Sequence, residues 1–282
     1  MSMTNKLGKR IPADFKAKIP FYKNVRSFDN NIRIFLKNQG IRKSYLSDKR
    51  YIAYEDEIKK LHNIHKGQRC FILATGPSLQ KTNVKILKDE ILFGVNTLVR
   101  GLPDIGIKKI DYYAASDYNI FNLYSKKFLT LDTTLFLGGH TGQIYLSKKE
   151  EYEQYQKNEP ILVRSLGRLL YFGWKTKDIT KGTYTCHLIP AAMCLPIAYY
   201  MGFKEVYLLG CDCDFTGKKH HFDGFKATKD KLPNYNDIYW AETFKEFEIL
   251  KEGFEENGRK IYNSTIGGKL EVFERKKIED VI

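Results

Sequence analysis

The sequence predicts an α/β protein built on a doubly wound, mostly parallel sheet, and two observations carry this prediction. From residue 67 onward, short apolar runs alternate with longer segments of helical periodicity, which is the pattern of parallel strands joined by helices. The apolar runs end in glycine, serine, asparagine or aspartate, residue types that favour turns. With 282 residues, of which 43% are hydrophobic, the chain can bury the core of one large domain with an appendage.

The elements can be placed in order along the chain. The predicted strands are residues 70–74, 91–95, 110–115, 135–137, 205–209 and a last strand that starts over 260–262. The predicted helices span residues 80–87, 184–201 and 239–257. Pro190 and Pro196 predict a kink in the second of these helices, where His187 is expected to be a structural histidine. The third helix has an apolar stripe made of Phe244, Phe247, Leu250 and Phe254.

The first 66 residues differ from the rest of the chain. Short basic pieces alternate there with short apolar ones, and residues 32–41 and 54–65 have weak helical periodicity. We therefore predict a basic, helical N-terminal arm over residues 1–66 and an α/β domain over residues 67–282. A stretch rich in lysine and glycine predicts a lid at about residues 213–237 of that domain.

Composition limits the classes of binding partner and the cellular compartment that we expect. Lys and Arg total 47 against 33 Asp and Glu, a net charge of +14, which favours anionic partners such as lipid headgroups, acidic glycans or nucleotides. Nucleic acid is not expected, because the charge is spread and no nucleic-acid motif accompanies it. No apolar run reaches the roughly 18 residues of a membrane span. The expected location is the cytoplasm, with peripheral contact on the inner membrane face allowed.

Candidate ligand-binding residues follow the predicted strands. In doubly wound sheets, ligands bind beyond the carboxyl ends of the strands, and a glycine-containing turn before a helix can bind phosphate through its N–H groups. A Thr-Lys-Gly step before the helix over 184–201 has the same features. Ordinary turn formation and helix capping are the alternative interpretations. The predicted nucleotide-binding residues are Thr75, Gly76, Pro77, Ser78, Asn96, Ser116, Asp117, Asn119, Thr180, Lys181, Gly182 and Asp212.

The candidate catalytic residues are His220, His221 and Asp212. The two histidines lie in a loop beside an aspartate, and histidine can remove a proton from a hydroxyl near neutral pH. Asp214, Tyr235 and Trp240 are predicted to contact the acceptor or to belong to the lid, although Trp240 could equally be a core residue. We expect no metal and no other cofactor, because Asp212 and Asp214 have no obvious third ligand. The five cysteines form no CxxC pair and are expected to be reduced, buried thiols.

Several segments together resemble one superfamily. Residues 67–79, which contain Gly-Pro-Ser-Leu, resemble the opening of small bacterial sialyltransferases. They equally resemble the polysaccharide-biosynthesis proteins that are grouped with the archaeal hydroxymethylpterin diphosphokinase. The likeness covers about residues 67–275, and its other segments are 94–96, 179–182, 202–212, 260–265 and 267–273.

This resemblance implies a Rossmann-like domain with a lid that transfers a sugar from a CMP-sugar donor, usually without a metal. It implies that Gly76, Ser78 and Asn96 hold the nucleotide, and that Thr180 and Gly182 hold its phosphate or the donor sugar. The sialyltransferases have a histidine base just before the helix that here starts near Tyr239, where this chain has Ile238. The base role would then pass to His220 or His221. Their arginine before the threonine step is represented by Asp178, and their two lid tyrosines are not matched at Cys213 or Asp214.

The leading hypothesis is therefore a glycosyltransferase of bacterial surface polysaccharide synthesis, of lipopolysaccharide or capsule for example. It would use a CMP-sugar or another nucleotide-sugar donor and a glycan or lipid-linked acceptor. One alternative is a diphosphokinase-like phosphotransferase with Mg²⁺ at Asp212 and Asp214. Another is a non-catalytic nucleotide or glycan binder that docks on an anionic membrane through the basic arm. Formation of an oligomer is compatible with all three.

Overall fold

The computed structural model describes residues 40, 43, 47–103, 105–214 and 237–282. The chain divides into two compact units, Met1–Ser44 and Tyr45–Ile282. The second unit contains the sheet and all the elements considered below. The predicted lid lies largely outside the described residues, as does most of the predicted arm.

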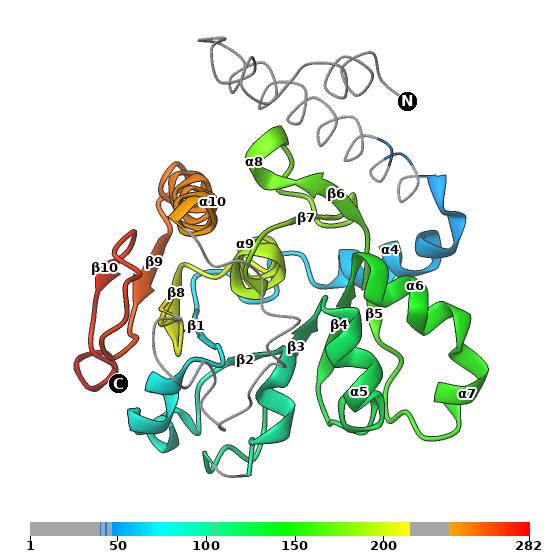
Figure 1. Ribbon diagram of the computed structural model, residues 1–282, viewed down its shortest axis with the longest axis horizontal. Helices are drawn as coiled ribbons and strands as arrows, with labels where there is room; N and C mark the ends of the chain where they lie inside the picture. The colour runs from blue at the N-terminus through cyan, green and yellow to red at the C-terminus, as the bar shows by residue number, and fades with distance from the viewer. Residues whose placement is uncertain (1–39, 41–42, 44–46, 104, 215–236) are drawn as a thin grey trace, which may run out of the picture. The chain divides into compact units, whose positions relative to one another are not determined.

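A parallel sheet of eight strands forms the centre of the second unit, in the order β10-β9-β8-β1-β2-β3-β4-β5 (Figure 1). All the strand pairs in this sheet are parallel, which confirms the predicted fold class. A separate parallel pair is formed by β6 and β7. The strands are β1 (Arg69–Leu73), β2 (Leu92–Val95), β3 (Tyr112–Ala115), β4 (Thr134–Gly138), β5 (Ile161–Val163), β6 (Ser165–Arg168), β7 (Thr183–Thr185), β8 (Glu205–Leu209), β9 (Lys260–Asn263) and β10 (Glu274–Arg275).

Helices connect these strands, and several of them are short. The α-helices are α4 (Ile52–Lys60), α5 (Tyr118–Leu129), α6 (Gly139–Ser147), α7 (Lys149–Glu153), α8 (Leu169–Phe172), α9 (Leu195–Tyr200) and α10 (Asp237–Glu255). A π-helical turn, η5 (Pro190–Cys194), leads directly into α9. The 3-10 helices are η1 (Lys49–Tyr51), η2 (Pro77–Lys81), η3 (Val84–Leu87), η4 (Asn96–Arg100) and η7 (Ile278–Asp280). None of the helices in the described ranges is long and apolar enough to cross a bilayer.

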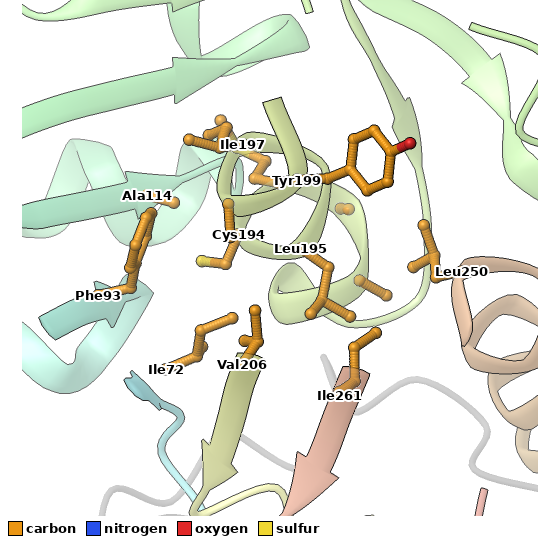
Figure 2. Close-up of a cluster of buried hydrophobic side chains, with 14 of the residues drawn as sticks. Ile72, Phe93, Ala114, Cys194, Leu195, Ile197, Tyr199, Val206, Leu250 and Ile261 are labelled. Carbon is orange, nitrogen blue, oxygen red and sulfur yellow. The ribbon is translucent and has the colours of Figure 1, made fainter. Parts of the chain in front are cut away.

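The sheet is covered on both faces because its strands are apolar on both. Side chains alternate along a strand; in β1, Cys70 and Ile72 belong to one buried cluster, and Phe71 and Leu73 to another. Helices α9 and α10 cover the first face and α5 covers the second (Figure 1). Figure 2 shows strand residues of the first face pointing toward Cys194, Leu195 and Ile197 of the η5–α9 segment.

The strand order reverses beside β1. From β1 the chain builds β2, β3, β4 and β5 outward in one direction, and it later returns to place β8, β9 and β10 on the other side. The connections on the two sides of β1 therefore leave the sheet in opposite directions, and ligands of doubly wound sheets typically bind at such a position, at the carboxyl ends of the strands. We call this position the switch point.

The region just before the sheet belongs to the same unit as the sheet. Helix α4 packs against β5, and Tyr54 and Ile58 are buried. Glu55 of α4 is paired with the buried Arg164 at 2.5 Å. The structure thus places the division into compact units after Ser44, whereas residues 45–66 were assigned to the arm on sequence alone.

Two predicted helices differ from the observed elements, and both differences have local causes. Residues 80–87 form parts of η2 and η3 rather than an α-helix, because the Thr82 hydroxyl donates to the Ser78 carbonyl and the chain turns at Asn83. Residues 184–201 begin as strand β7, since β-branched and aromatic residues favour extended backbone. The predicted kink is the π-turn η5, which precedes Pro196, a residue with no N–H to donate.

Substitution of two leucines, one in the core and one at the surface, should have clearly different effects on the free energy of unfolding. Replacing the fully buried Leu195 by alanine should lower the free energy of unfolding by about 2–5 kcal/mol, because it removes core methyl groups and leaves a cavity. Leu123→Ala on the exposed side of α5, where the side chain is 68% exposed, should change it by less than about 0.5 kcal/mol. Urea unfolding of the two variants measures this, and equal losses would contradict the assigned core.

Candidate functional site

The carboxyl ends of the parallel strands bring the predicted strand-end residues to one edge of the sheet. Residues 75–78 follow β1, Asn96 follows β2, Ser116 and Asp117 follow β3, and residues 210–212 follow β8. Because β8, β1, β2 and β3 are neighbours in that order, these segments lie along one continuous edge. The switch point is at the first two of these strands.

A clamp of hydrogen bonds joins the two chain segments at the switch point. The Asp212 carboxylate accepts from the Ser78 hydroxyl at 2.6 Å and from the Ser78 backbone N–H at 3.2 Å. The Gly76 N–H donates to the Gly210 carbonyl at 2.8 Å. We call these four residues the switch-point clamp. It ties the turn after β1 to the turn after β8, which are 134 residues apart in the chain.

The clamp explains why residue 76 is glycine. A Cβ atom at this position would lie 1.9 Å from the Asp212 carboxylate and 2.5 Å from the Gly210 carbonyl. The close approach that Gly76 permits is therefore between two segments of the chain, and not between the chain and a ligand. The N–H groups of Gly76 and Ser78 are both used within the chain, and Pro77 has none to offer. A phosphate would have to replace these bonds, and phosphate binding by residues 75–78 stays a prediction.

The clamp also sets the electrostatics of Asp212. Burial raises the pKa of the Asp212 carboxyl above its ordinary value, while the two bonds from Ser78 and the charge of Lys81 act in the opposite direction. Burial raises the pKa of the neighbouring Cys213 to about 12 and that of Cys211 well above its usual range, which disfavours the thiolate form of both. The five cysteines form no disulfide in the structure, and all but Cys186 are buried.

Asn96 stands out among the strand-end residues. Its backbone has a positive φ of 36°, a conformation that non-glycine residues rarely adopt and that recurs at functional sites. Its side-chain Oδ1 is buried and has no hydrogen-bond partner among the residues that the structure describes. Buried polar atoms are normally paired, and an unpaired one calls for an explanation. A ligand that donates a hydrogen bond at this edge would supply the missing partner.

The residues after β3 have mainly local roles. Asp117 is the N-cap of α5 and accepts from the N–H groups of Asn119 and Ile120, which matches the capping alternative. Asn119 is exposed. Ser116 lies beside Gly138 at the end of β4, where a Cβ on the glycine would meet the Ser116 Cβ at 3.1 Å. Ser116 therefore remains a candidate ligand-binding residue at the carboxyl edge of the sheet, whereas Asp117 stabilises α5.

The structure does not bring the Thr180–Gly182 step together with the switch point. Thr180 donates to Asp178 through its N–H and its hydroxyl, and Gly182 lies against the Arg164 carbonyl. Thr180 and Lys181 line a hollow of about 620 Å³ together with Lys59, Lys177, Tyr200 and Arg259. Tyr200 and Arg259 come just before β8 and β9, so this hollow lies toward the amino ends of the strands.

The remaining predicted residues divide into two groups. Asp214 pairs with Lys269 at 3.2 Å, and Trp240 stacks on Phe244 and packs against the core. His220, His221 and Tyr235 lie outside the described residues. Asp212 accepts from Ser78 and Asp214 pairs with Lys269, so both carboxylates have partners within the described residues. The described residues also contain no group of three or more His, Cys, Asp or Glu residues that could hold a metal ion.

Sequence reasoning missed a cluster of charged residues between β6, β7 and α10. His187 lies just after β7, outside any apolar helix, and it contacts Arg168, Glu242 and Glu246. The expectation that His187 sits within the helix is wrong, because that helical segment begins only at residue 189. A signal was present in the sequence: Glu246 lies four residues before Leu250 and one before Phe247, on the buried stripe of α10.

The fold defines a doubly wound α/β protein whose candidate ligand-binding residues follow the carboxyl ends of its strands. A family profile described as 6-hydroxymethylpterin diphosphokinase MptE-like matches residues 43–218. That match spans more than half of the chain, and the protein belongs to this family, as the sequence resemblance predicts.

Comparison with solved structures gives low-identity matches. The sialyltransferase CstII from Campylobacter jejuni in complex with cytidine-5'-monophosphate is 16% identical, with a TM-score of 0.47, over 74% of this chain and 85% of that one. CstII in complex with CMP-3FNeuAc is 18% identical, with a TM-score of 0.48, over 73% and 85%. A search of curated proteins gave no match.

The switch-point clamp predicts a pH-dependent stability effect. Ser78→Ala removes the shorter bond to the Asp212 carboxylate and should destabilise the protein by about 1–2 kcal/mol near pH 7. The same change should raise the Asp212 pKa further, because the ionised form loses a donor. Since a raised pKa makes the folded state bind the proton more tightly, the effect of Ser78→Ala should shrink as pH falls through the folded pKa.

Urea unfolding near pH 4 and near pH 7 measures this difference. Ser147→Ala, at an exposed site in α6, is the matched control and should show no such pH dependence. A loss for Ser78→Ala that is equal at both pH values would mean that the bond to the Asp212 carboxylate does not matter.

Proposed function

We propose that this protein is a glycosyltransferase that binds a nucleotide-activated sugar, a CMP-sugar, at the carboxyl edge beside the switch point. The observation that carries this proposal is the buried Oδ1 of Asn96 at the end of β2, which has no hydrogen-bond partner in the described part of the chain. An amide oxygen accepts hydrogen bonds. The hydroxyls of a ribose and the exocyclic amine of cytosine are donors of the kind that this oxygen lacks.

The position of the resembling segments supports the same proposal. Residues 67–79 form β1 and its turn, residues 94–96 end β2, and residues 202–212 form β8 and its turn. These three segments are neighbours in the sheet, although they come from distant parts of the sequence. Three of the segments that carry the resemblance therefore meet at one edge of the sheet, whereas residues 179–182 lie apart from the switch point.

The further elements of the proposal follow from the sequence. The acceptor would be a glycan or a lipid-linked sugar of a bacterial surface polysaccharide, and residues 213–237 would close over the donor. A net charge of +14 would favour peripheral contact with an anionic membrane on its cytoplasmic face. Thr75, Ser116 and Asn96 would line the donor side of the crevice.

Incubation with a panel of CMP-, UDP- and GDP-sugars tests the activity. We expect release of free CMP from one CMP-sugar, with turnover retained in the presence of a chelator. Release of AMP from ATP on a hydroxymethyl acceptor, abolished by the chelator, would favour the diphosphokinase-like alternative. Nucleotide binding without release from any donor would favour the non-catalytic alternative, and either result would refute the proposal.

Asn96 gives a sharper test of where the nucleotide binds. Asn96→Ala removes one hydrogen bond to the ligand and should weaken CMP binding by about 1 kcal/mol, about five-fold in Kd. Asn83→Ala is the matched control, because Asn83 is exposed and its side chain makes no capping bond. Calorimetric titration with CMP measures both. Unchanged affinity in the Asn96 variant would place the nucleotide elsewhere.

A further inference from the structure

A basic hollow lies at the amino edge of the sheet. It has a volume of about 620 Å³, and its cationic lining residues are Lys59, Lys177, Lys181 and Arg259. Asp178 is the single carboxylate among its described lining residues. We call this cavity the amino-edge hollow.

The amino-edge hollow is built on the starts of three neighbouring strands. Asn63 precedes β1, Tyr200 precedes β8 and Arg259 immediately precedes β9. Strands β9, β8 and β1 are adjacent in that order. The Asn63 N–H donates to the Tyr200 carbonyl at 3.1 Å, which ties the segment before β1 to the end of α9. The hollow therefore lies at the edge opposite to the strand ends that form the candidate nucleotide site.

Uncharged groups hold Arg259 in place. Its Nη1 donates to the Tyr199 carbonyl, and its guanidinium lies 4.2 Å from the centroid of the Tyr199 ring. No ion pair joins Arg259 to a carboxylate within the described residues. A carbonyl and an aromatic ring fix the position of a guanidinium without cancelling its charge. Arg259 is thus a positioned cation whose charge is left to act on the hollow.

Asp178 is directed to its own turn. Its carboxylate accepts from the N–H of Thr180 at 3.0 Å and from the hydroxyl of the same residue at 2.7 Å. Lys181 is exposed and makes no ion pair with a residue that the structure describes. The charge of Lys181 is therefore available to a ligand as well.

The other two lysines have partners only at the surface. Lys59 pairs with Asp56 at 2.8 Å, and Lys177 pairs with Glu256 at 2.9 Å. These carboxylates are 80% and 67% exposed, and such exposed pairs contribute little. Like charges brought together repel each other. The hollow therefore has an excess of positive charge that a bound anion would compensate.

This lining favours a phosphate over a carboxylate ligand. The arginine fork can donate two parallel hydrogen bonds to phosphate oxygens, and lysines add point charges around them. A phosphate monoester carries about −1.5 to −2 charges near pH 7, whereas a carboxylate carries only one. A volume of about 620 Å³ lies in the range of small-molecule sites. It leaves room for part of the group that bears the phosphate.

We propose that the amino-edge hollow binds a phosphate monoester, with Arg259 and Lys181 as its main contacts. The phosphate belongs either to the headgroup of an anionic lipid or to a soluble phosphorylated molecule. This site is separate from the nucleotide site, and the inference does not rest on the proposed function.

Two probes that carry the same phosphate monoester distinguish these sources. Glycerol 3-phosphate is soluble, and phosphatidic acid presents the group on vesicles of phosphatidylcholine. Calorimetric titration and vesicle sedimentation measure binding by the full chain, with pure phosphatidylcholine as the reference. Binding of glycerol 3-phosphate would support a soluble ligand, and binding of the phosphatidic acid vesicles alone would support a lipid headgroup. Binding of neither probe would overturn the inference.

A double variant assigns this binding to the hollow. Arg259→Gln combined with Lys181→Gln should weaken binding of the probe by about ten-fold or more, because two charged donors to the phosphate are lost. Lys126→Gln combined with Lys127→Gln, at exposed positions of α5, removes the same charge elsewhere. This matched control should keep the affinity within about two-fold, since distant exposed charges are screened. Equal losses in both double variants, or no loss in either, would overturn the inference.

A second variant leaves the contact between Arg259 and Tyr199 intact. Lys181→Glu reverses one exposed charge and should weaken binding of the probe by about five-fold or more. Its free energy of unfolding in urea should equal that of the wild type, because Lys181 makes no ion pair with a described residue. Wild-type affinity for the probe in the folded Lys181→Glu protein would contradict a role for the hollow.

CMP separates the amino-edge hollow from the nucleotide site. The Arg259 and Lys181 double variant should keep its CMP affinity within about two-fold, because the strand ends after β1 and β2 lie at the other edge of the sheet. Asn96→Ala should leave binding of the phosphate probe unchanged. A parallel loss of CMP and probe affinity in the double variant would overturn the inference, since the hollow would then be the nucleotide site.

Discussion

The hydrogen bonds between Asp212 and Ser78 are the constraint on which the candidate site depends. A doubly wound sheet opens a crevice where its strand order reverses, and here that crevice is bounded by two turns that no local sequence connects. The carboxylate of one turn holds both the hydroxyl and the N–H of the other. Gly76 lets the turns approach, since any Cβ would collide with Asp212. The glycine thus serves the close approach of two chain segments.

Much of the sheet could be predicted from the sequence, because its strands are short apolar runs that end in turn residues. Strand β8 was placed over its exact span, and β1, β2 and β9 to within a residue or two. Strands β5, β6 and β10 were not predicted; β6 (Ser-Leu-Gly-Arg) and β10 (Glu-Arg) contain too few apolar residues to be recognised as strands. Most of strand β7 was predicted as part of the following helix, because Thr183–Thr185 adjoins an apolar segment that is helical from residue 189. Only pairing with β6 shows that these three residues are extended.

The site was harder to predict than the fold, for a physical reason. The residue types at the strand ends suit ligand binding, but the same types also cap helices and close turns. Asp117 and Thr180 have such local partners, whereas the Asn96 Oδ1 has none among the described residues. The cluster of charged residues between β6, β7 and α10 depends on three elements that meet only in the folded chain. Its one visible sign was Glu246, a carboxylate on an otherwise apolar helix stripe.

The positions of the buried cysteines allow local opening of the structure to be followed by chemical labelling. Cys70 and Cys194 are fully buried beneath the helices on one face of the sheet, while Cys211 and Cys213 flank Asp212 at the crevice. Burial raises the pKa of all four thiols. Because they are also shielded from solvent, an alkylating reagent can reach them only when the surrounding structure opens. Labelling of the second pair ahead of the first would reveal opening of the crevice alone. Simultaneous labelling of both pairs would mean that the crevice opens only when the whole domain unfolds.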